Sequence, residues 1–371
     1  MHPLPGTNVE NLDTPCLVVD LDAVDRNIAR RADAARKAGI ALRPHAKTHK
    51  SARFGRRQVA AGAVGLCCQK VGEVEAMVAG GIADILLTNE IVGPAKLVRL
   101  AALARQATLR TVVDNAEAAA ALGAAARAAG VTLGVLVDCD LGQARTGIAD
   151  PGLAAELGRF AARTDGLRFD GLQAYHGGIQ HVAGWAARKA ASDAANRLLA
   201  EFRSAFAAAG LTPAIVSGAG TGTFGFQAQA GYTEWQCGTY IFMDRQYRDI
   251  GGDDGGAYGP FEQALTVLTT VMSLPAPDRI VVDAGLKSLS IDGGLPAVPG
   301  LPGWNFAFGG DEHGKLLRAT EDAAARPKLG DRLHVVPGHG DTTINLHDEY
   351  FVVGGGKLLG VWPVEARGKV R

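Results

Sequence analysis

The chain has 371 residues, 47% of them hydrophobic, and its 38 Lys and Arg residues balance 38 Asp and Glu residues. This length accommodates a barrel-sized domain of roughly 250 residues and a smaller second domain. The neutral charge balance leaves no electrostatic footprint for nucleic acid or for an anionic membrane, so we expect neither as a partner.

The N-terminal segment MHPLPGTNVENLDTP lacks the basic and then apolar layout of a signal peptide. No apolar run in the chain approaches the roughly 18 residues that a bilayer-spanning helix needs. The five cysteines form no CxxC pair, which indicates buried free thiols rather than disulfides or a thiolate metal site. We therefore expect a cytoplasmic protein. The next segment, PCLVVDL (15–21), predicts a strand that pairs with the C-terminal part of the chain.

Residues 22–247 alternate between Ala-rich stretches and short apolar runs. Stretches such as DLDAVDRNIARRADAARKAG (20–39) and NAEAAAALGAAARAAG (115–130) have charges at helical spacing and end in Gly, which is typical of α-helices. The apolar runs between helices predict parallel strands covered on both faces. There are eight: 41–47, 64–69, 84–89, 109–114, 133–140, 169–177, 214–222 and 235–244.

Eight successive strand–helix units predict a (β/α)8 TIM-type barrel over residues 22–247. A doubly wound open sheet is the alternative, but it needs a Gly-rich phosphate turn after the first strand, where this chain has RPHAKTHK. After the Gly-rich segment GGDDGGAYGP (251–260), the apolar segments alternate and carry Gly and Pro turns. We therefore expect residues 248–371, together with 1–21, to form a mostly antiparallel β domain.

Lys47 lies at the end of the first predicted barrel strand, where such barrels place their sites. A partly desolvated lysine there can act as a carbonyl nucleophile. The alternative is that Lys47 and Lys50 are both solvated charges at the rim. Two small-residue stretches with hydroxyls, SGAGTGTFGF (217–226) after strand seven and CGTYIFMD (237–244) at strand eight, lie where this barrel usually binds phosphate. A lysine facing phosphate loops is the pattern that pyridoxal 5′-phosphate requires.

The segment VVPGHGDTTINLHDEYFVV (335–353) contains His339 and Asp341, two residues apart. In an extended segment both side chains leave the same face, and one imidazole with one carboxylate suits Zn²⁺, Mn²⁺ or Mg²⁺. An HxD pair in a Gly-rich loop is also compatible with an ordinary turn. The same ambiguity applies to His176, at the end of the sixth predicted strand, and to His181, which follows that strand.

Together these segments resemble the D-threonine aldolase branch of the alanine-racemase-like, fold-type III pyridoxal-phosphate enzymes. The resemblance runs from about residue 13 to the C-terminus and is carried by ordered motifs. These are RPHAKTHK, CCQKVGEVEAMVAGGI, LLTNEIVGPAK, DCDLGQARTGI, GLQAYHGGIQH, GAGTGT, YTEWQCGTYIFMD, VMSLPAPDRIVVDAGLKSLS and PGHGDTTINLHDEY.

The resemblance implies a barrel that carries the cofactor, a C-terminal β domain and a homodimer. It implies that Lys47 forms the Schiff base, that Arg145 faces the pyridine nitrogen and that His181 lies near the substrate hydroxyl. His339 and Asp341 resemble divalent-metal ligands. The further cofactor-binding residues that it implies are Gln69, Tyr175, Thr221, Gly222, Gly238, Thr239 and Tyr240.

Relatives that dehydrate D-serine or hydroxyaspartate tend to carry Cys where this chain has Asp341. The Asp favours the aldolase branch and a harder metal, Mn²⁺ or Mg²⁺ over Zn²⁺. The expected function is therefore cleavage of a 3-hydroxy-D-amino acid to glycine and an aldehyde. A D-serine or 3-hydroxyaspartate dehydratase and a 3-hydroxyaspartate aldolase giving glyoxylate remain alternatives, while a racemase and a non-catalytic cofactor carrier fit the sequence less well.

Overall fold

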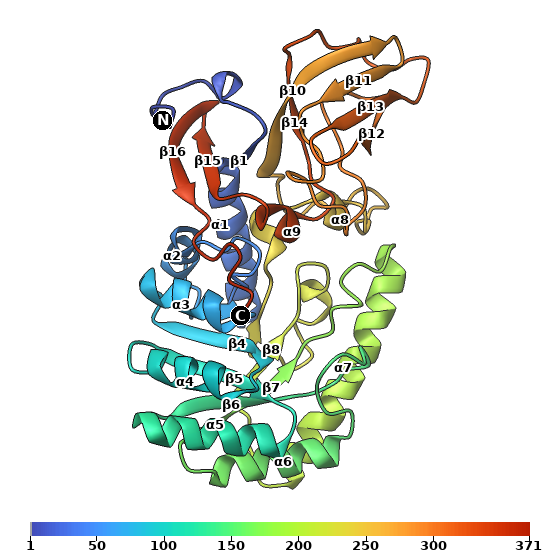
Figure 1. Cartoon of the computed structure of the whole chain (residues 1–371). Coiled ribbons are helices and arrows are strands. Elements are labelled where there is room, and N and C mark those ends of the chain that lie inside the picture. Colours follow the sequence, from blue (N-terminus) through green and yellow to red (C-terminus); the bar gives the residue numbers. More distant parts are fainter. Residues whose placement is uncertain (1) are drawn as a thin grey trace.

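The computed structural model describes residues 2–371 and contains two eight-stranded sheets. The first sheet is entirely parallel, in the order β2-β9-β8-β7-β6-β5-β4-β3. A parallel bridge between His45 and Cys67 joins its two ends, so the sheet closes into a barrel (Figure 1). Its strands are β2 (Ala41–Leu42), β3 (Leu66–Cys68), β4 (Asp84–Glu90), β5 (Thr108–Val113), β6 (Leu133–Asp138), β7 (Leu167–Ala174), β8 (Ile215–Gly218) and β9 (Glu234–Trp235).

The predicted TIM-like barrel is thus confirmed, and a helix precedes or follows each strand in the expected alternation. The Asp20 side chain accepts from the N–H of Ala23 at the start of α1, and Gly39 ends this helix in the left-handed conformation. Asn115 and Gly130 do the same for α5. The barrel helices are α1 (Leu21–Ala38), α2 (Ala52–Ala60), α3 (Val71–Ala79), α4 (Pro94–Leu103), α5 (Ala116–Ala129), α6 (Pro151–Arg163) and α7 (Trp185–Ala208).

The second sheet has the order β12-β13-β11-β10-β1-β15-β16, and β14 pairs with β10. Its pairs are antiparallel except β1 with β15, as expected for a mostly antiparallel domain. The N-terminal strand lies in this sheet, with Cys16 opposite Leu268. The strands are β1 (Cys16–Asp20), β10 (Leu265–Ala276), β11 (Arg279–Val282), β12 (Trp304–Phe308), β13 (Gly314–Arg318), β14 (Arg332–Val335), β15 (Glu349–Gly354) and β16 (Lys357–Pro363). The domain boundaries at residues 22 and 247 stay a prediction.

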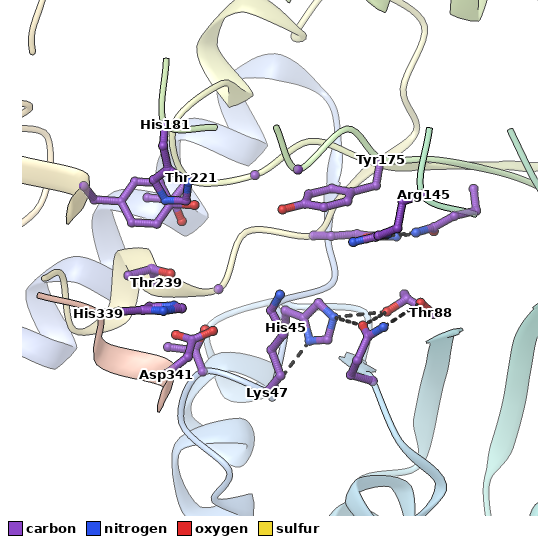
Figure 2. Close-up of a pocket in the computed structure, with 18 residues that line it drawn as sticks. His45, Lys47, Thr88, Arg145, Tyr175, His181, Thr221, Thr239, His339 and Asp341 are labelled. Atoms are coloured by element: carbon purple, nitrogen blue, oxygen red, sulfur yellow. Dashed lines mark hydrogen bonds between the residues drawn. The ribbon is translucent and has the colours of Figure 1, made fainter. Parts of the chain in front are cut away.

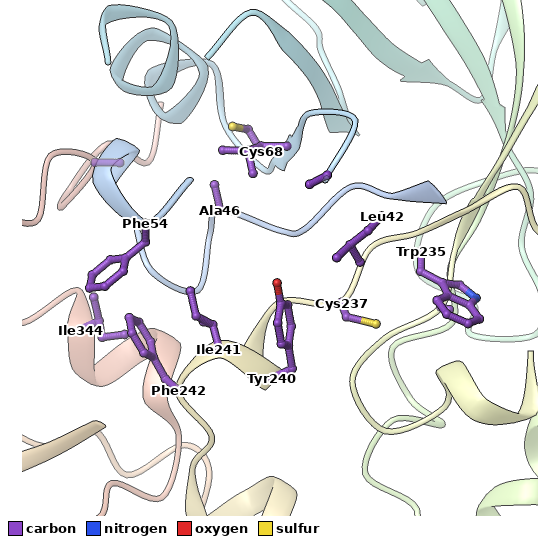
Figure 3. Packing of buried hydrophobic residues seen from close by; sticks show 14 of the residues in the cluster. Leu42, Ala46, Phe54, Cys68, Trp235, Cys237, Tyr240, Ile241, Phe242 and Ile344 are labelled. Carbon is purple, nitrogen blue, oxygen red and sulfur yellow. The ribbon is translucent and has the colours of Figure 1, made fainter. Parts of the chain in front are cut away.

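Aromatic packing fixes the second sheet against the mouth of the barrel. Phe54 of α2 meets Phe242 and Tyr350 edge-on, with ring centroids 5.1 and 5.3 Å apart. The Tyr350 hydroxyl donates to the His49 carbonyl at 2.6 Å. Figure 3 shows Ile344, from the short helix α9 (Gly340–Ile344), beside the rings of Phe54 and Phe242. Because α9 follows His339, this core holds the HxD pair over the barrel mouth.

All five cysteines are buried and free, as the sequence predicted. None of the helices within residues 2–371 combines the length and the apolarity that a membrane crossing requires.

Candidate active site

A cavity of about 380 Å³ lies at the C-terminal mouth of the barrel and reaches the loop before α9 (Figure 2). Such a volume suits a small molecule. All predicted site residues except Gly222 and Tyr240 line it: Lys47, Gln69, Arg145, Tyr175, His181, Thr221, Gly238, Thr239, His339 and Asp341. The structure thus brings together residues from six barrel strand ends and from the second domain.

Only one of the two candidate lysines offers its amine to the cavity. No hydrogen bond or ion pair engages the Lys47 amine within residues 2–371, and Figure 2 shows it among the lining side chains. Lys50 is buried, and its Nζ lies 2.7 Å from Glu73 Oε1 in an ion pair. An amine that is held by a carboxylate in a buried ion pair is not free to attack a carbonyl carbon in the cavity. The geometry therefore supports Lys47.

His45, which the sequence did not single out, stands beside Lys47. Its Nδ1 accepts from the Lys47 N–H at 3.3 Å, and its Nε2 lies 3.0 Å from Thr88 Oγ1 and 3.3 Å from Gln69 Oε1. With Nδ1 accepting, the ring proton resides on Nε2. Burial, and then the charge of Lys47, lowers the pKa of His45 well below its ordinary value. The ring is therefore neutral and brings no second cation next to the lysine.

Glu73 links Lys50 by hydrogen bonds to the part of the cavity wall that lies next to Lys47. Its Oε1 pairs with Lys50, while its Oε2 accepts from the Gln69 N–H at 2.7 Å. Gln69 in turn contacts His45 and, through Nε2, the Thr88 carbonyl. This chain of bonds fixes the wall of the cavity next to Lys47.

Arg145 lies at the opposite wall, with its guanidinium carbon 5.7 Å from the centroid of the Tyr175 ring. The loop that carries it is folded around Asp140, whose carboxylate accepts from the N–H groups of Gly142 and Gln143 at 2.9 and 2.8 Å. Gln143 Oε1 also accepts from the Gly177 N–H at 2.7 Å, which ties this loop to the end of β7. These hydrogen bonds hold the loop in place and so fix the position of the Arg145 guanidinium in the cavity wall.

A cradle of free backbone donors lies where the loops after β8 and β9 meet. Thr221, Gly238 and Thr239 line the cavity, and their N–H groups have no hydrogen-bond partner within residues 2–371. A Cβ on Gly238 would lie 2.5 Å from Thr48 Oγ1, so only glycine permits this close approach. Unpaired N–H groups at a concave wall form an anion site, and these donors fit a phosphate group.

Gly222 and Tyr240 lie behind this cradle rather than in the cavity wall. The Gly222 N–H donates to Gln180 Oε1 at 3.2 Å. The Tyr240 side chain points into the hydrophobic core (Figure 3), and its hydroxyl accepts from Gln58 at 3.0 Å. Its N–H donates to Thr221 Oγ1 at 3.2 Å, so it supports the cradle from behind.

The HxD pair occupies the third wall. His339 is the N-cap of α9 and Asp341 lies in its first turn, so the expectation of an extended segment at this pair is wrong. The two side chains still meet at the cavity, because the chain turns into the helix between them. One carboxylate oxygen of Asp341, Oδ1, is buried without a partner within residues 2–371.

Asp292, which the sequence did not reveal, lies directly behind His339. Its Oδ2 accepts from His339 Nδ1 at 2.6 Å, and its Oδ1 accepts from Thr342 Oγ1 at 2.7 Å. A carboxylate on one imidazole nitrogen is the usual support of a metal-binding histidine, because it leaves the other nitrogen free as a ligand. Although burial opposes the effect, the Asp341 carboxylate and the Asp292 hydrogen bond raise the pKa of His339.

The unpaired Asp341 oxygen and the supported His339 ring therefore fit a divalent cation with two protein ligands. Within residues 2–371, no cluster of three or more His, Cys, Asp or Glu side chains has the geometry of a metal site. The other coordination positions at this pair would belong to water or substrate.

His181 completes the same wall. Its ring packs against Tyr247, with centroids 4.5 Å apart, and its Nε2 is buried without a partner in the described part of the chain. Burial, and then the charge of His339, lowers the pKa of His181 to about 4. His181 is therefore a neutral imidazole near pH 7, with a nitrogen able to accept a proton.

The chain is similar to known proteins both in sequence and in fold. Residues 19–246 match the family "Alanine racemase, N-terminal domain", and residues 264–353 match "Putative serine dehydratase domain". The chain is 44% identical to 3-hydroxy-D-aspartate aldolase of Paracoccus denitrificans, over 99% of this chain and 95% of the relative. It is 43% identical to D-threonine aldolase of an Arthrobacter species, over 98% and 95%. The crystal structure of D-threonine aldolase from Filomicrobium marinum superposes with a TM-score of 0.95, at 42% identity and full coverage of both chains.

Proposed function

Because this chain belongs to the D-threonine and 3-hydroxy-D-aspartate aldolase branch of the alanine-racemase-like enzymes and is an aldehyde-lyase, we propose that it cleaves 3-hydroxy-D-amino acids to glycine and an aldehyde. One observation carries the proposal. A single cavity contains a lysine amine without a partner and, from the other domain, a carboxylate-supported His–Asp pair. In the proposed reaction these groups would engage opposite ends of a small amino acid bound in this cavity.

The family implies pyridoxal phosphate, and the residues that line the cavity support a proposed position for each part of it. Lys47 would hold its aldehyde carbon, Arg145 and Tyr175 its ring, and the N–H groups of Thr221, Gly238 and Thr239 its phosphate. When bound, this cofactor withdraws electrons from the substrate Cα, which permits cleavage of the Cα–Cβ bond. Arg145 keeps its proton at any accessible pH, so it can hydrogen-bond a ring nitrogen without protonating it.

His339 Nε2 and the Asp341 carboxylate would hold a divalent cation, for which Mn²⁺ or Mg²⁺ is the choice that the carboxylate ligand favours. A bound cation lowers the pKa of a hydroxyl that it ligates. His181, neutral near pH 7, is placed to accept the proton of the substrate's 3-hydroxyl on Nε2. That nitrogen is buried from bulk water, and the Tyr247 ring packs against the imidazole that carries it.

A dehydratase is the second candidate, because the C-terminal match carries the description of a serine dehydratase domain. Both reactions use the same cavity, but dehydration breaks the Cβ–O bond and yields a keto acid and ammonia. Asp341 in place of Cys at the metal position favours the aldolase. The proposed aldolase reaction covers both aldehyde products, acetaldehyde from D-threonine and glyoxylate from 3-hydroxy-D-aspartate.

Product analysis tests the proposed function. The purified chain, loaded with pyridoxal phosphate and Mn²⁺, is incubated separately with D-threonine and 3-hydroxy-D-aspartate, and products are separated by chromatography. We expect equimolar glycine and aldehyde from at least one substrate. Keto acid and ammonia would instead establish the dehydratase, and an inverted amino acid a racemase. Light scattering on the same sample tests the homodimer that we also propose.

A further inference from the structure

The phosphate cradle has no cationic side chain in its wall. Thr221, Gly238 and Thr239 offer neutral backbone and hydroxyl donors. A phosphate monoester carries between about −1.5 and −2 charges near pH 7. Neutral donors can solvate such an anion, but in a buried site a counter-charge stabilises it more strongly.

Buried cations elsewhere in the barrel are neutralised by carboxylates. Arg43, 2% exposed, donates to Glu234 at 2.9 Å and pairs with Asp84 at 2.5 Å. Lys50 pairs with Glu73 at 2.7 Å. This is the ordinary pattern, because an unpaired buried charge is costly.

Arg31, on the inner face of α1, departs from that pattern. It is 0% exposed, and none of its three guanidinium nitrogens has a hydrogen-bond partner within residues 2–371. The guanidinium carbon lies 3.7 Å from the Phe224 ring centroid and 4.3 Å from that of Trp235. Two aromatic faces attract a cation but do not replace its lost hydration. No carboxylate among residues 2–371 forms an ion pair with this guanidinium.

The two rings that hold Arg31 belong to the two loops of the cradle. Phe224 follows Thr221 by three residues, and Trp235 precedes Gly238 by three. Figure 3 shows Trp235 in the same buried cluster as Tyr240, whose N–H donates to Thr221 Oγ1. Arg31 therefore packs against side chains of the same two loops that carry the donors of the cradle.

Arg188, also 0% exposed, lies on the other side of the loop after β8. It has no carboxylate partner within residues 2–371 either, but its donors are all engaged by carbonyls, including Gly222 at 3.1 Å and Gly251 at 2.7 Å. Its guanidinium carbon lies 5.4 Å from the Tyr258 ring, and the Tyr258 hydroxyl donates to the Thr221 carbonyl. Arg188 thus shapes the loop by hydrogen bonds, whereas Arg31 makes none.

We propose that Arg31 and Arg188 are the buried counter-charge of the cofactor phosphate, acting as positioning residues that do not touch it. Arg188 also shapes the loop after β8, whereas Arg31 has no other role. The proposal rests on the proposed function, since it takes the phosphate to bind at Thr221, Gly238 and Thr239. Two uncompensated cations in a region of low dielectric constant offset the charge of a phosphate dianion. They also explain how this site holds a dianion without a lysine or arginine in its wall.

The test compares pyridoxal phosphate with pyridoxal, which lacks the phosphate. Cofactor-free full-length chain is titrated with each, and the visible absorption of the lysine-linked form gives the two dissociation constants. Arg31→Met keeps an apolar stem between the rings but removes the charge. We expect it to reduce the preference for the phosphorylated form on the order of ten-fold, with pyridoxal binding little changed, because a buried charge is weakly screened.

Arg30→Met is the matched control, because Arg30 is the neighbouring residue of α1, half-exposed, and pairs with Glu262 at the surface at 2.9 Å. It removes the same charge and should leave the preference unchanged. An unchanged preference in a folded Arg31→Met variant would overturn the proposal. If wild-type chain forms no lysine-linked species with either compound, the proposed function itself fails, which is a different result.

Two measurements cover the case in which Arg31→Met does not fold. Arg31→Lys keeps the charge, and a folded Lys variant that loses the preference contradicts the proposal. In wild-type chain, phosphorus NMR of the bound cofactor should show a dianion down to below about pH 6, where a free phosphate ester takes up a proton. A bound phosphate that titrates like the free ester overturns the proposal without any variant.

Discussion

Replacement of Asp292 by Asn tests the metal site through a residue that would not touch the metal. Asp292 Oδ2 accepts from His339 Nδ1 at 2.6 Å, and its other oxygen accepts from Thr342 at 2.7 Å. An amide keeps the size of the side chain and one acceptor but removes the negative charge. The imidazole of His339 then loses both basicity and a fixed orientation.

The size of the effect follows from the exposure of this pair. Loss of such a supporting carboxylate costs about 10–100-fold in metal affinity, or about 1.4–2.7 kcal/mol. The Asp292 side chain is 49% exposed and that of His339 24%, so water partly replaces the lost interaction. We therefore expect the lower end of the range, about ten-fold.

The assay is a Mn²⁺ titration of the full-length chain against a competing chelating dye at fixed pH. Glu312→Gln is the matched control, because Glu312 forms a surface ion pair with Lys287 at 2.6 Å and exposes 60% of its side chain. It should leave the affinity unchanged. Equal affinities of wild type and Asp292→Asn, together with lost binding in Asp341→Asn, would refute the role given to Asp292. Unchanged Mn²⁺ binding in Asp341→Asn would refute the metal site.

Four further predictions concern substitutions of single residues. Lys47→Ala should abolish the visible absorption of the lysine-linked cofactor, whereas Lys50→Ala should retain it; the reverse would exchange their roles. Glu73→Ala leaves the Lys50 ammonium buried and unpaired, so the free energy of unfolding should fall by about 3–5 kcal/mol, seen as a lower melting temperature. Burial, and then a neighbouring carboxyl, raises the pKa of Asp138 above its ordinary value of about 4. Above about pH 4, the folded state therefore holds a proton that the unfolded state releases, so wild-type stability falls as the pH rises. Asp138→Asn should gain stability relative to wild type over this pH range, measured by melting at pH 4 and at pH 7. Gly171→Ala should abolish soluble expression, because its Cβ would lie 1.8 Å from a carbonyl oxygen of β8.

The sequence located the barrel and most of the cavity, because the chemistry-bearing residues follow strands in a repeating order. Lys47, Thr221 and Thr239 lie within predicted strand segments and beyond the last residue of the observed strands, and the closure of the barrel brings all such positions to one mouth. The ends of the strands were less predictable. β2 and β9 contribute only two paired residues each, because the chain leaves the ladder early to form the cavity wall.

The supporting residues could not be predicted in this way, because their partners are distant in sequence. Asp292 precedes His339 by 47 residues and reaches it through an irregular loop. Arg31 resembles its exposed neighbour Arg30 in an amphipathic helix, and only the fold shows which of them is buried. His45 had a local signal, since it lies two residues before Lys47, but a histidine at a strand end is compatible with many roles.

A crystal structure of the loaded chain with a bound 3-hydroxy-D-amino acid that turns over slowly tests the central claim most directly. We expect the amino group of the ligand to lie at the Lys47 side of the cavity and its 3-hydroxyl to lie at the cation held by His339 and Asp341. A ligand whose 3-hydroxyl points toward Arg145, away from the His–Asp pair, would contradict it.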